Sequence, residues 1–243
     1  TRAMVGLSGG LDSTLALLVI ASAFDMMGEK REKIHCVTMP CFGTTDRTYQ
    51  NACQLSRCIG AELSEINIKE AVKQHFADIG HSMDVHDVTY ENSQARERTQ
   101  VLMDLANQEN AILVGTGDLS ELALGWATYN GDHMSMYGVN ASIPKTLVRH
   151  LVRYYADTCK DDTLRAVLLD ILDTPVSPEL LPPKEGEIAQ KTEDLVGPYE
   201  LHDFFLYYML RAGFEPGKIY RIACATFMGM YDKETILKWL KTF

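Results

Sequence analysis

The first half of the chain alternates short apolar runs with longer segments in which apolar residues recur at helical spacing. Short apolar runs are typical of strands, and segments with helical spacing are long enough to cross over between them. We predict strands at residues 3–7, 33–40, 61–67 and 111–117, and helices at residues 11–26, 49–59, 69–79 and 92–110. Because strands that alternate with helices pair in parallel, this pattern indicates an α/β fold, an open parallel sheet sandwiched by helices.

The second half differs, because the strand signal stops near residue 125. Residues 125–140 are rich in Gly, Asn and Asp, which predicts a loop. Helices are predicted at residues 145–158, 163–172, 200–212, 216–222 and 233–241. Residues 173–198 carry five prolines and no clear period, which is typical of a functional lid or of disorder. We therefore predict one domain over residues 1–243, with an α/β core at 1–140, a helical C-terminal part at 141–243 and a mobile loop near 173–198.

Composition narrows the classes of protein that fit. The 243 residues are 46% hydrophobic and 23% charged, which is enough to bury a sizeable core. A net charge of −10 argues against a nucleic-acid surface, because such a surface needs an excess of Lys and Arg. No apolar run approaches the roughly 18 residues of a membrane span. The six cysteines form no CxxC pair, which favours free thiols and a cytoplasmic location.

The sequence SGGLDS, residues 8–13, lies between the first predicted strand and the first predicted helix. Its glycines let the backbone approach an anion, and the helix start offers unpaired N–H groups. The hydroxyls of Ser8, Ser13 and Thr14 add donors, whereas Asp12 would repel a phosphate unless Mg²⁺ lies between them. The alternative is a tight glycine turn capped by Ser8 or Asp12. The lysine of the GxxxxGK[ST] phosphate-binding pattern is missing.

Two further segments end predicted strands: MPCFG at residues 39–43 and GTGDLSE at residues 115–121. In an open parallel sheet, ligands bind beyond the C-terminal ends of the strands. We therefore expect these two segments and residues 8–13 to converge on one crevice.

SGGLDS matches the SGGxDS signature of the PP-loop ATP pyrophosphatases, which cleave ATP to AMP and pyrophosphate while adenylating a substrate. Within that superfamily the chain resembles the synthetase domain of the long, glutamine-dependent NAD synthetases. The resemblance runs over most of the chain and implies an adenine-nucleotide alpha-hydrolase-like, Rossmann-like sheet. It is carried by MPCFGTTDRTYQNA, ENSQARERTQVLMDLAN, VGTGDLSELALGWATYNGDHMSMYGVNASIPKTLVRHL and KTEDLVGPYELHDFFLYYML.

The resemblance also implies which residues form the site. The implied ATP contacts are Gly6, Leu7, Ser8, Gly9, Gly10, Leu11, Asp12, Ser13, Met39, Phe42, Thr116, Lys145 and Ser177. The implied deamido-NAD contacts are Asn92, Arg96, Glu121, Trp126 and Asp132. Asp12 and Glu121 would share Mg²⁺, and together with Lys145 they would form the catalytic group. The short, ammonia-dependent enzymes carry a loop lysine where this chain has Tyr129, so that role is not transferred.

The same residues have plainer structural interpretations. Glu121 would be a solvated carboxylate favoured at a helix start, and Lys145 would lie in the first turn of an exposed helix. Asn92 would cap a helix, and Arg96 would form a surface ion pair. His81, Asp84, His86 and Asp87 form a second group of possible metal ligands. Their spacing fits neither one face of a helix nor a known zinc pattern, so we expect no metal there.

The activity that the resemblance implies is that of a ligase. The carboxylate of deamido-NAD would attack the α-phosphorus of ATP, and ammonia would then displace AMP to leave NAD. Ammonia would come from a fused glutaminase domain upstream, outside this chain, and the enzyme would be a homodimer or larger. Two alternatives stay open: another PP-loop amidation, such as that of GMP synthetase, or a non-catalytic adenine-nucleotide-binding module.

Overall fold

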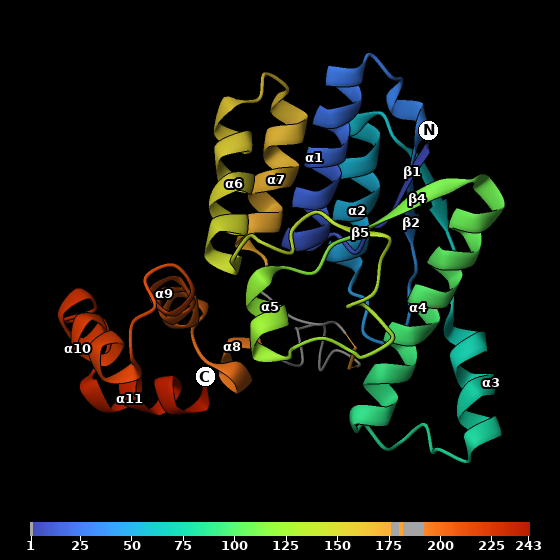
Figure 1. Ribbon diagram of the computed structural model, residues 1–243. Coiled ribbons are helices and arrows are strands. Elements are labelled where there is room, and N and C mark those ends of the chain that lie inside the picture. The colour runs from blue at the N-terminus through green and yellow to red at the C-terminus, as the bar shows by residue number, and fades with distance from the viewer. Residues whose placement is uncertain (1, 176–179, 182–191) are drawn as a thin grey trace.

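The computed structural model of the chain describes residues 2–175, 180–181 and 192–243. Its centre is a five-stranded parallel sheet of order β3-β2-β1-β4-β5 (Figure 1). The strands are β1 (Arg2–Gly6), β2 (Ile34–Thr38), β3 (Glu62–Glu65), β4 (Ala111–Gly115) and β5 (Tyr137–Gly138). The inner strands β1 and β4 are largely apolar and β2 is buried throughout, because helices cover both faces of the sheet. The predicted α/β class is confirmed.

The described helices include all nine predicted ones, each ending within about four residues of its predicted limits, and two short additional ones. They are α1 (Leu11–Met27), α2 (Asp46–Ile59), α3 (Lys69–Ile79), α4 (Val88–Glu109), α5 (Leu119–Leu124), α6 (Lys145–Thr158), α7 (Asp162–Asp173), α8 (Thr192–Val196), α9 (Tyr199–Leu210), α10 (Pro216–Thr226) and α11 (Lys233–Thr242), with a 3₁₀ turn η1 at Arg31–Lys33. None of the described helices has the length and apolar character to cross a membrane.

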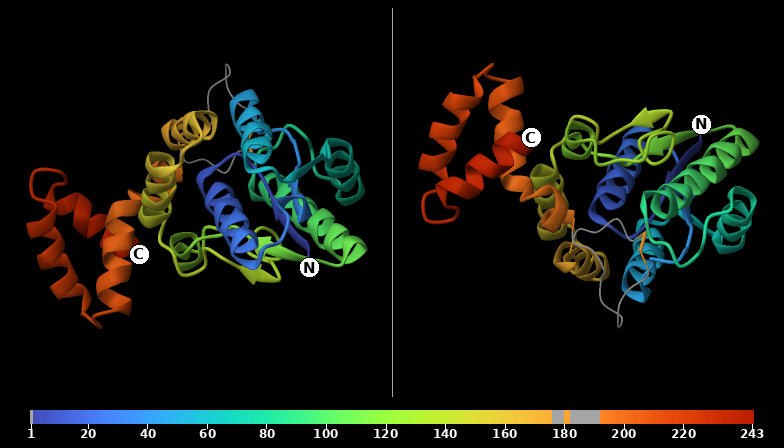
Figure 2. Two further views of the ribbon diagram at one scale, coloured as in Figure 1. Left: turned by 90° about the horizontal axis from the view of Figure 1, so that it is seen from above. Right: turned by 90° about the horizontal axis from the view of Figure 1, so that it is seen from below.

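Two hydrophobic cores lie against the sheet, one on each face (Figure 2). On one face α1, α2, α6 and α7 pack together, and their core includes Leu17, Leu55, Val152 and Leu168. On the other face α3 and α4 pack around Phe76 and Tyr90. The helices α6 and α7, which the sequence assigns to the helical C-terminal part, therefore complete the core of the sheet.

The last three helices form a third hydrophobic cluster beside the sheet (Figure 1). Its buried residues are Leu201, Phe205, Ile219, Ala223, Phe227 and Ile236. Helix α9 is the link between this cluster and the rest of the molecule, because it packs against both α5 and α6.

The structure adds elements that the hydrophobic pattern misses. The two-residue strand β5 lies inside the predicted loop 125–140, and it is too short to show a period. Helix α4 begins earlier than predicted because the Asp87 carboxylate caps it, accepting from the N–H groups of Thr89 and Tyr90. Helices α5 and α8 are also additional. Most of the loop predicted near residues 173–198 lies outside the described residues.

Candidate functional site

The strand order reverses between β1 and β4, and this point positions the site. The chain passes from β1 to β2 and β3 on one side of the sheet, and β4 and β5 lie on the other side. Ligands of open parallel sheets bind outside the carboxyl ends of the strands at such a point. A cavity of about 320 Å³ lies there. It is lined by ten of the predicted site residues: Gly6, Leu7, Ser8, Asp12, Ser13, Met39, Thr116, Glu121, Trp126 and Asp132. The expected convergence of three segments is confirmed.

The loop before α1 is held tightly against α2. Gly9 has a φ of +85°, and a Cβ atom on it would lie 2.1 Å from the carbonyl oxygen of Thr48. Only glycine fits this position without displacing the loop. Gly10 is the N-cap of α1 and provides no side-chain cap, so the first N–H groups of the helix have no partner within it. These groups, with the hydroxyls of Ser8 and Ser13 3.1 Å apart, form a small cradle that suits an anion, and the Ser13 hydroxyl also donates to the Gly10 carbonyl oxygen at 3.2 Å.

Thr14 does not belong to this cradle. Its side chain is fully buried, and its hydroxyl donates to the carbonyl oxygen of Gly10 at 2.8 Å. Unlike Ser13, Thr14 is not among the residues that line the cavity, so the structure gives no support to its predicted role as a donor to phosphate. The turn interpretation of the loop holds in part, since the Ser8 hydroxyl accepts from the Gly10 N–H at 3.2 Å.

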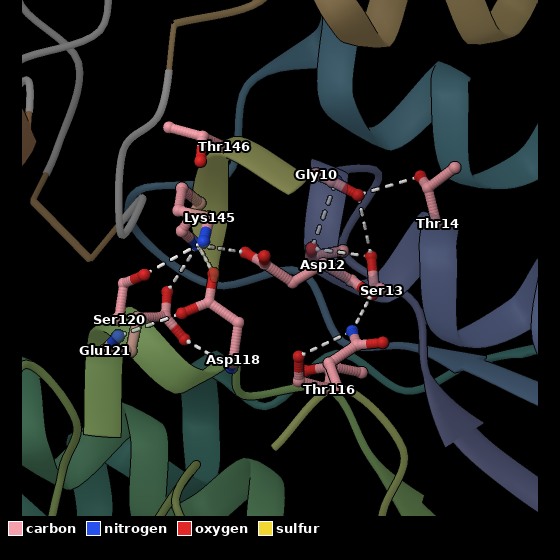
Figure 3. Close-up of polar contacts among 12 residues, drawn as sticks. Gly10, Asp12, Ser13, Thr14, Thr116, Asp118, Ser120, Glu121, Lys145 and Thr146 are labelled. Atoms are coloured by element: carbon pink, nitrogen blue, oxygen red, sulfur yellow. Dashed lines mark hydrogen bonds and ion pairs between the residues drawn. The ribbon is translucent and has the colours of Figure 1, made fainter. Parts of the chain in front are cut away.

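The ammonium of Lys145 lies among three carboxylates beside the cradle (Figure 3). Its Nζ is 2.7 Å from Asp12 Oδ2, 2.9 Å from Asp118 Oδ2 and 2.9 Å from Glu121 Oε1. The Lys145 side chain is 4% exposed and that of Asp118 is 0% exposed. These contacts exclude the interpretation of Lys145 as a residue of an exposed helix, and that of Glu121 as a solvated carboxylate. They join the starts of three helices, α1, α5 and α6.

The cluster is short of positive charge, because one ammonium faces three carboxylates. Burial and the charge of Asp12 raise the pKa of Glu121 to about 8. Burial also raises the pKa of Asp118 to about 6, although Lys145 opposes that change. Burial alone would lower the pKa of Lys145, but the surrounding carboxylates raise it well above its usual range. The three carboxylates together with Lys145 carry two net negative charges when all are ionised.

This charge and donor set fit a divalent cation. One oxygen from each of Asp12, Asp118 and Glu121 lies within 4.8 Å of the others, and carboxylate oxygens are ligands that Mg²⁺ accepts. The second oxygen of Asp12, Oδ1, is buried without a hydrogen-bond partner. Within the described part of the chain, no other group of three such ligands lies this close together. His81, by contrast, contacts Asp87 at 3.0 Å and belongs to the capped start of α4.

Asp118 is the member of the cluster that the sequence prediction missed. Its Oδ1 accepts from the N–H of Glu121 at 2.9 Å, and Glu121 Oε2 accepts from the N–H of Asp118 at 3.3 Å. This reciprocal pair is a capping box at the start of α5. The Asp-x-x-Glu spacing directly after a glycine-rich strand end was the available signal.

Asn92 and Arg96 both hold the loop that follows α5. Asn92 Oδ1 accepts from the Thr128 hydroxyl at 2.8 Å, and Arg96 Nε donates to the Tyr129 carbonyl oxygen at 3.1 Å. Asn92 does not cap α4, because Asp87 does. The two residues share a helix face as expected from their spacing. They contact the loop and are not among the residues that line the cavity.

The same loop carries Trp126 and Asp132 into the lining of the cavity. Asp132 Oδ1 accepts from the backbone N–H of Thr128 at 2.6 Å, and burial raises the pKa of Asp132. The loop thus brings an aromatic ring and a carboxylate to the cavity. Their contacts with deamido-NAD stay predictions.

The remaining predicted ATP contacts occupy varied places. Met39 lines the cavity, whereas the Phe42 ring packs on Tyr90 with ring centroids 5.7 Å apart. Leu11 is buried in the first turn of α1. Ser177 lies outside the described residues. The roles of these residues toward ATP stay predictions.

Comparisons with known proteins identify the family to which this sequence is similar. The family model for NAD synthase matches residues 1–217. The glutamine-dependent NAD(+) synthetase of Mycobacterium leprae is 47% identical over 224 residues, 90% of this chain and 33% of that protein. The chain therefore spans 33% of the length of the first curated relatives that it matches.

Solved structures show the same fold. The chain is similar to a glutamine-dependent NAD(+) synthetase from Cytophaga hutchinsonii, with a TM-score of 0.74 and 20% identity, covering 99% of this chain and 44% of that one. It is also similar to the Acinetobacter baumannii enzyme in complex with ADP, with a TM-score of 0.62 and 24% identity, covering 99% of this chain and 39% of that one.

Proposed function

The chain belongs to the NAD synthase family, and from this premise we propose that it converts deamido-NAD to NAD while ATP is cleaved to AMP and pyrophosphate. The observation that carries the proposal is the cluster of Lys145 with Asp12, Asp118 and Glu121 directly beside the SGGLDS cradle. Family membership does not favour the alternatives, a GMP synthetase-like amidation or a non-catalytic nucleotide-binding module.

The proposed reaction has two steps. A carboxylate oxygen of deamido-NAD bonds to the α-phosphorus of ATP, the bond from that phosphorus to the bridging oxygen breaks, and pyrophosphate leaves with the electron pair. Ammonia then attacks the acyl carbon of the adenylate, AMP leaves, and a proton is released. The first step gives the carboxylate a good leaving group, which ammonia needs for displacement.

The chain's own residues contribute mainly positioning and charge. The cradle at the start of α1 binds phosphate oxygens through backbone N–H groups, which favour negative charge there. In this proposal the Lys145 ammonium neutralises the charge that develops on the departing pyrophosphate, so its effect is larger in the transition state than in the ground state. Asp12, Asp118 and Glu121 would hold Mg²⁺, which supplies further neutralisation of phosphate charge.

The substrates lie on two sides of this cluster in the proposal. ATP occupies the side of Ser8 and Met39, and deamido-NAD occupies the side of Trp126 and Asp132. Asn92 and Arg96 act by holding the loop that carries the latter pair. The immediate nitrogen donor is ammonia derived from glutamine, and we propose that the enzyme acts in the cytoplasm as a homo-oligomer.

The test is ATP-dependent AMP formation with deamido-NAD, Mg²⁺ and either ammonium or glutamine. We expect one AMP for each NAD formed with ammonium, and no AMP when xanthosine monophosphate replaces deamido-NAD. AMP formation with xanthosine monophosphate but not with deamido-NAD would refute this proposal in favour of the GMP synthetase alternative. ATP binding without AMP formation under any of these conditions would support the binding module.

The metal assignment is tested by variants. Asp12→Ala and Glu121→Ala should each abolish most of the activity, whereas Asp84→Ala, which removes an exposed carboxylate far along the sequence, should not. Wild-type rates in both of the first two variants would refute the assignment of Asp12 and Glu121.

A further inference from the structure

Helix α6, which begins at Lys145, has no cap of its own. Its N-cap is Pro144, whose side chain cannot accept a hydrogen bond. The first N–H groups of a helix have no partner within the helix, and leaving them unpaired in a buried place is costly. Lys145 is 3% exposed, so these groups need partners from elsewhere in the molecule.

The partners come from two other helices, α5 and α9, and Figure 3 shows the contact from α5. Ser120, on α5, accepts from the Lys145 N–H at 2.9 Å through its hydroxyl oxygen. Asp203, on α9, accepts from the Thr146 N–H at 2.8 Å through Oδ2. The Ser120 hydroxyl in turn donates to Asp203 Oδ1 in a short hydrogen bond.

The donor and the acceptor of each of these three hydrogen bonds are fixed. A backbone N–H can only donate, so the Ser120 oxygen accepts from Lys145 and its proton must point to Asp203. Both oxygens of Asp203 therefore accept, which suits a carboxylate and not an amide. Ser120 and Asp203 are 0% and 7% exposed, so water offers little substitute for these bonds. A carboxylate at a helix N-terminus is also favoured by the helix dipole.

We propose that Asp203 is a positioning residue for Lys145. It acts as a cap that α9 supplies to α6, both directly at Thr146 and through Ser120, and so fixes where the Lys145 side chain begins. A second contact supports this: the ring of Tyr199, also on α9, lies 5.4 Å from the Lys145 ammonium. The helical cluster of α9, α10 and α11 is thereby coupled to the Lys145 ammonium. The catalytic consequence rests on the proposed function, whereas the positioning itself does not.

The plainer interpretation is that Asp203 only attaches α9 to the sheet. The two differ in what happens to Lys145 when the protein stays folded. If Asp203 positions Lys145, removing its charge loosens the first turn of α6 and frees the ammonium. If Asp203 only attaches α9, removing its charge lowers the stability of the protein and leaves Lys145 as protected from chemical labelling as before.

The deciding experiment is chemical labelling of Lys145 in the folded protein without substrates. Asp203→Asn, Ser120→Ala and the control Asp232→Asn are exposed to formaldehyde and cyanoborohydride, and dimethylation of Lys145 is followed by peptide mass spectrometry. Asp232 caps α11 in the same way, its Oδ1 accepting from Thr235 N–H at 2.7 Å, but it does not contact α6.

We expect Asp203→Asn to raise the labelling rate of Lys145 roughly tenfold, because the amide NH2 cannot accept one of the two hydrogen bonds that Asp203 accepts. Asp232→Asn should change this rate less than twofold, with little change in the melting temperature, because Asn caps a helix nearly as well as Asp. If Asp203→Asn does not fold, as judged by circular dichroism, Ser120→Ala decides, with an expected rise of several fold. An unchanged rate in the folded variant, or an equal rise in Asp232→Asn, would overturn the proposal.

Steady-state kinetics provide a separate readout. Asp203→Asn should lower kcat for AMP formation roughly tenfold and change the KM for ATP much less, because the ammonium acts on the departing pyrophosphate. Absence of AMP formation in the wild type would refute the proposed function and leave the labelling result unaffected. Faster labelling of Lys145 with wild-type kcat would confine Asp203 to a structural role and overturn its link to catalysis.

Discussion

Replacing Lys145 by Met keeps an unbranched side chain of similar length and removes the ammonium from the carboxylate cluster. The wild-type ammonium lies within 2.9 Å of Asp12, Asp118 and Glu121. Its loss leaves three carboxylates close together with no cation. Asp118 is fully buried, so solvent cannot screen it.

The expected cost follows from this burial. Removing one partner of a buried ion pair costs about 3–5 kcal/mol, because a charge is left uncompensated. The carboxylates of Asp12 and Glu121 are 23% and 22% exposed, and Glu121 can take up a proton because its pKa is already raised. We therefore expect the free energy of unfolding of Lys145→Met to fall by about 3 kcal/mol, the lower end of that range.

Mg²⁺ should restore part of this loss. With all three carboxylates ionised, the variant presents three negative charges to a cation and the wild type a net two, so above the raised pKa of Glu121 the variant should bind Mg²⁺ more tightly without nucleotide. A ligand present at 100 times its Kd stabilises the folded state by about 2.7 kcal/mol. The difference between variant and wild type should therefore shrink as Mg²⁺ replaces EDTA in the buffer.

The assay is urea unfolding followed by tryptophan fluorescence and circular dichroism, in EDTA and across a Mg²⁺ series. Lys30→Met, which removes an exposed lysine, is the matched control and should change the unfolding free energy little. If Lys145→Met lowers the free energy of unfolding in EDTA by less than about 1 kcal/mol, the cluster contributes no more than a surface ion pair does. That result would refute the argument from burial. Equal Mg²⁺ stabilisation of variant and wild type would refute the charge argument.

Three further predictions concern the cradle, a buried histidine and the substrate loop. Gly9→Ala should lower the free energy of unfolding by about 2 kcal/mol or more, because its Cβ would lie 2.1 Å from the Thr48 carbonyl oxygen at positive φ. Burial lowers the pKa of His202 below its usual value, so the folded state prefers the neutral ring. The contribution of His202 to the free energy of unfolding should be fully present above about pH 6.5. It should fall as the pH drops, by at most about 1.4 kcal/mol per pH unit. His202→Gln should reduce this slope, which urea unfolding at several pH values measures. Arg96→Ala should raise the KM for deamido-NAD roughly tenfold with a smaller change in kcat, because Arg96 holds the loop at the Tyr129 carbonyl.

Each of these has a control. Gly10→Ala places its Cβ 3.4 Å from the Ser8 hydroxyl at negative φ, so it should unfold at nearly the wild-type urea concentration. His75→Gln, at an exposed position on α3, should leave the pH slope unchanged, and an unchanged slope in His202→Gln as well would contradict the assignment. Arg153→Ala removes an exposed arginine paired with Asp157 and should keep the wild-type KM, so a similar KM rise there would contradict a specific role for Arg96.

The sequence by itself was sufficient for four of the five strands and for the turn that forms the cradle, because each depends on residues that are close along the chain. Continuous apolar runs separated by helical periods specify parallel strands whatever the rest of the fold does. The glycines of SGGLDS act on their own backbone, and that pattern alone indicates a strand-to-helix turn with free N–H groups. The interpretation of Glu121 and Lys145 needed a family resemblance, since each has an ordinary structural interpretation when taken alone.

The tertiary structure decided which side chains meet. Asp12 and Lys145 are 133 positions apart, and Ser120 and Asp203 are 83 positions apart, distances over which no local pattern carries information. The structure also turned Thr14 into the core and gave α6 its cap from α9. The physical reason is that hydrogen bonds and ion pairs act over about 3 Å in space, and only the folded chain determines which groups come that close.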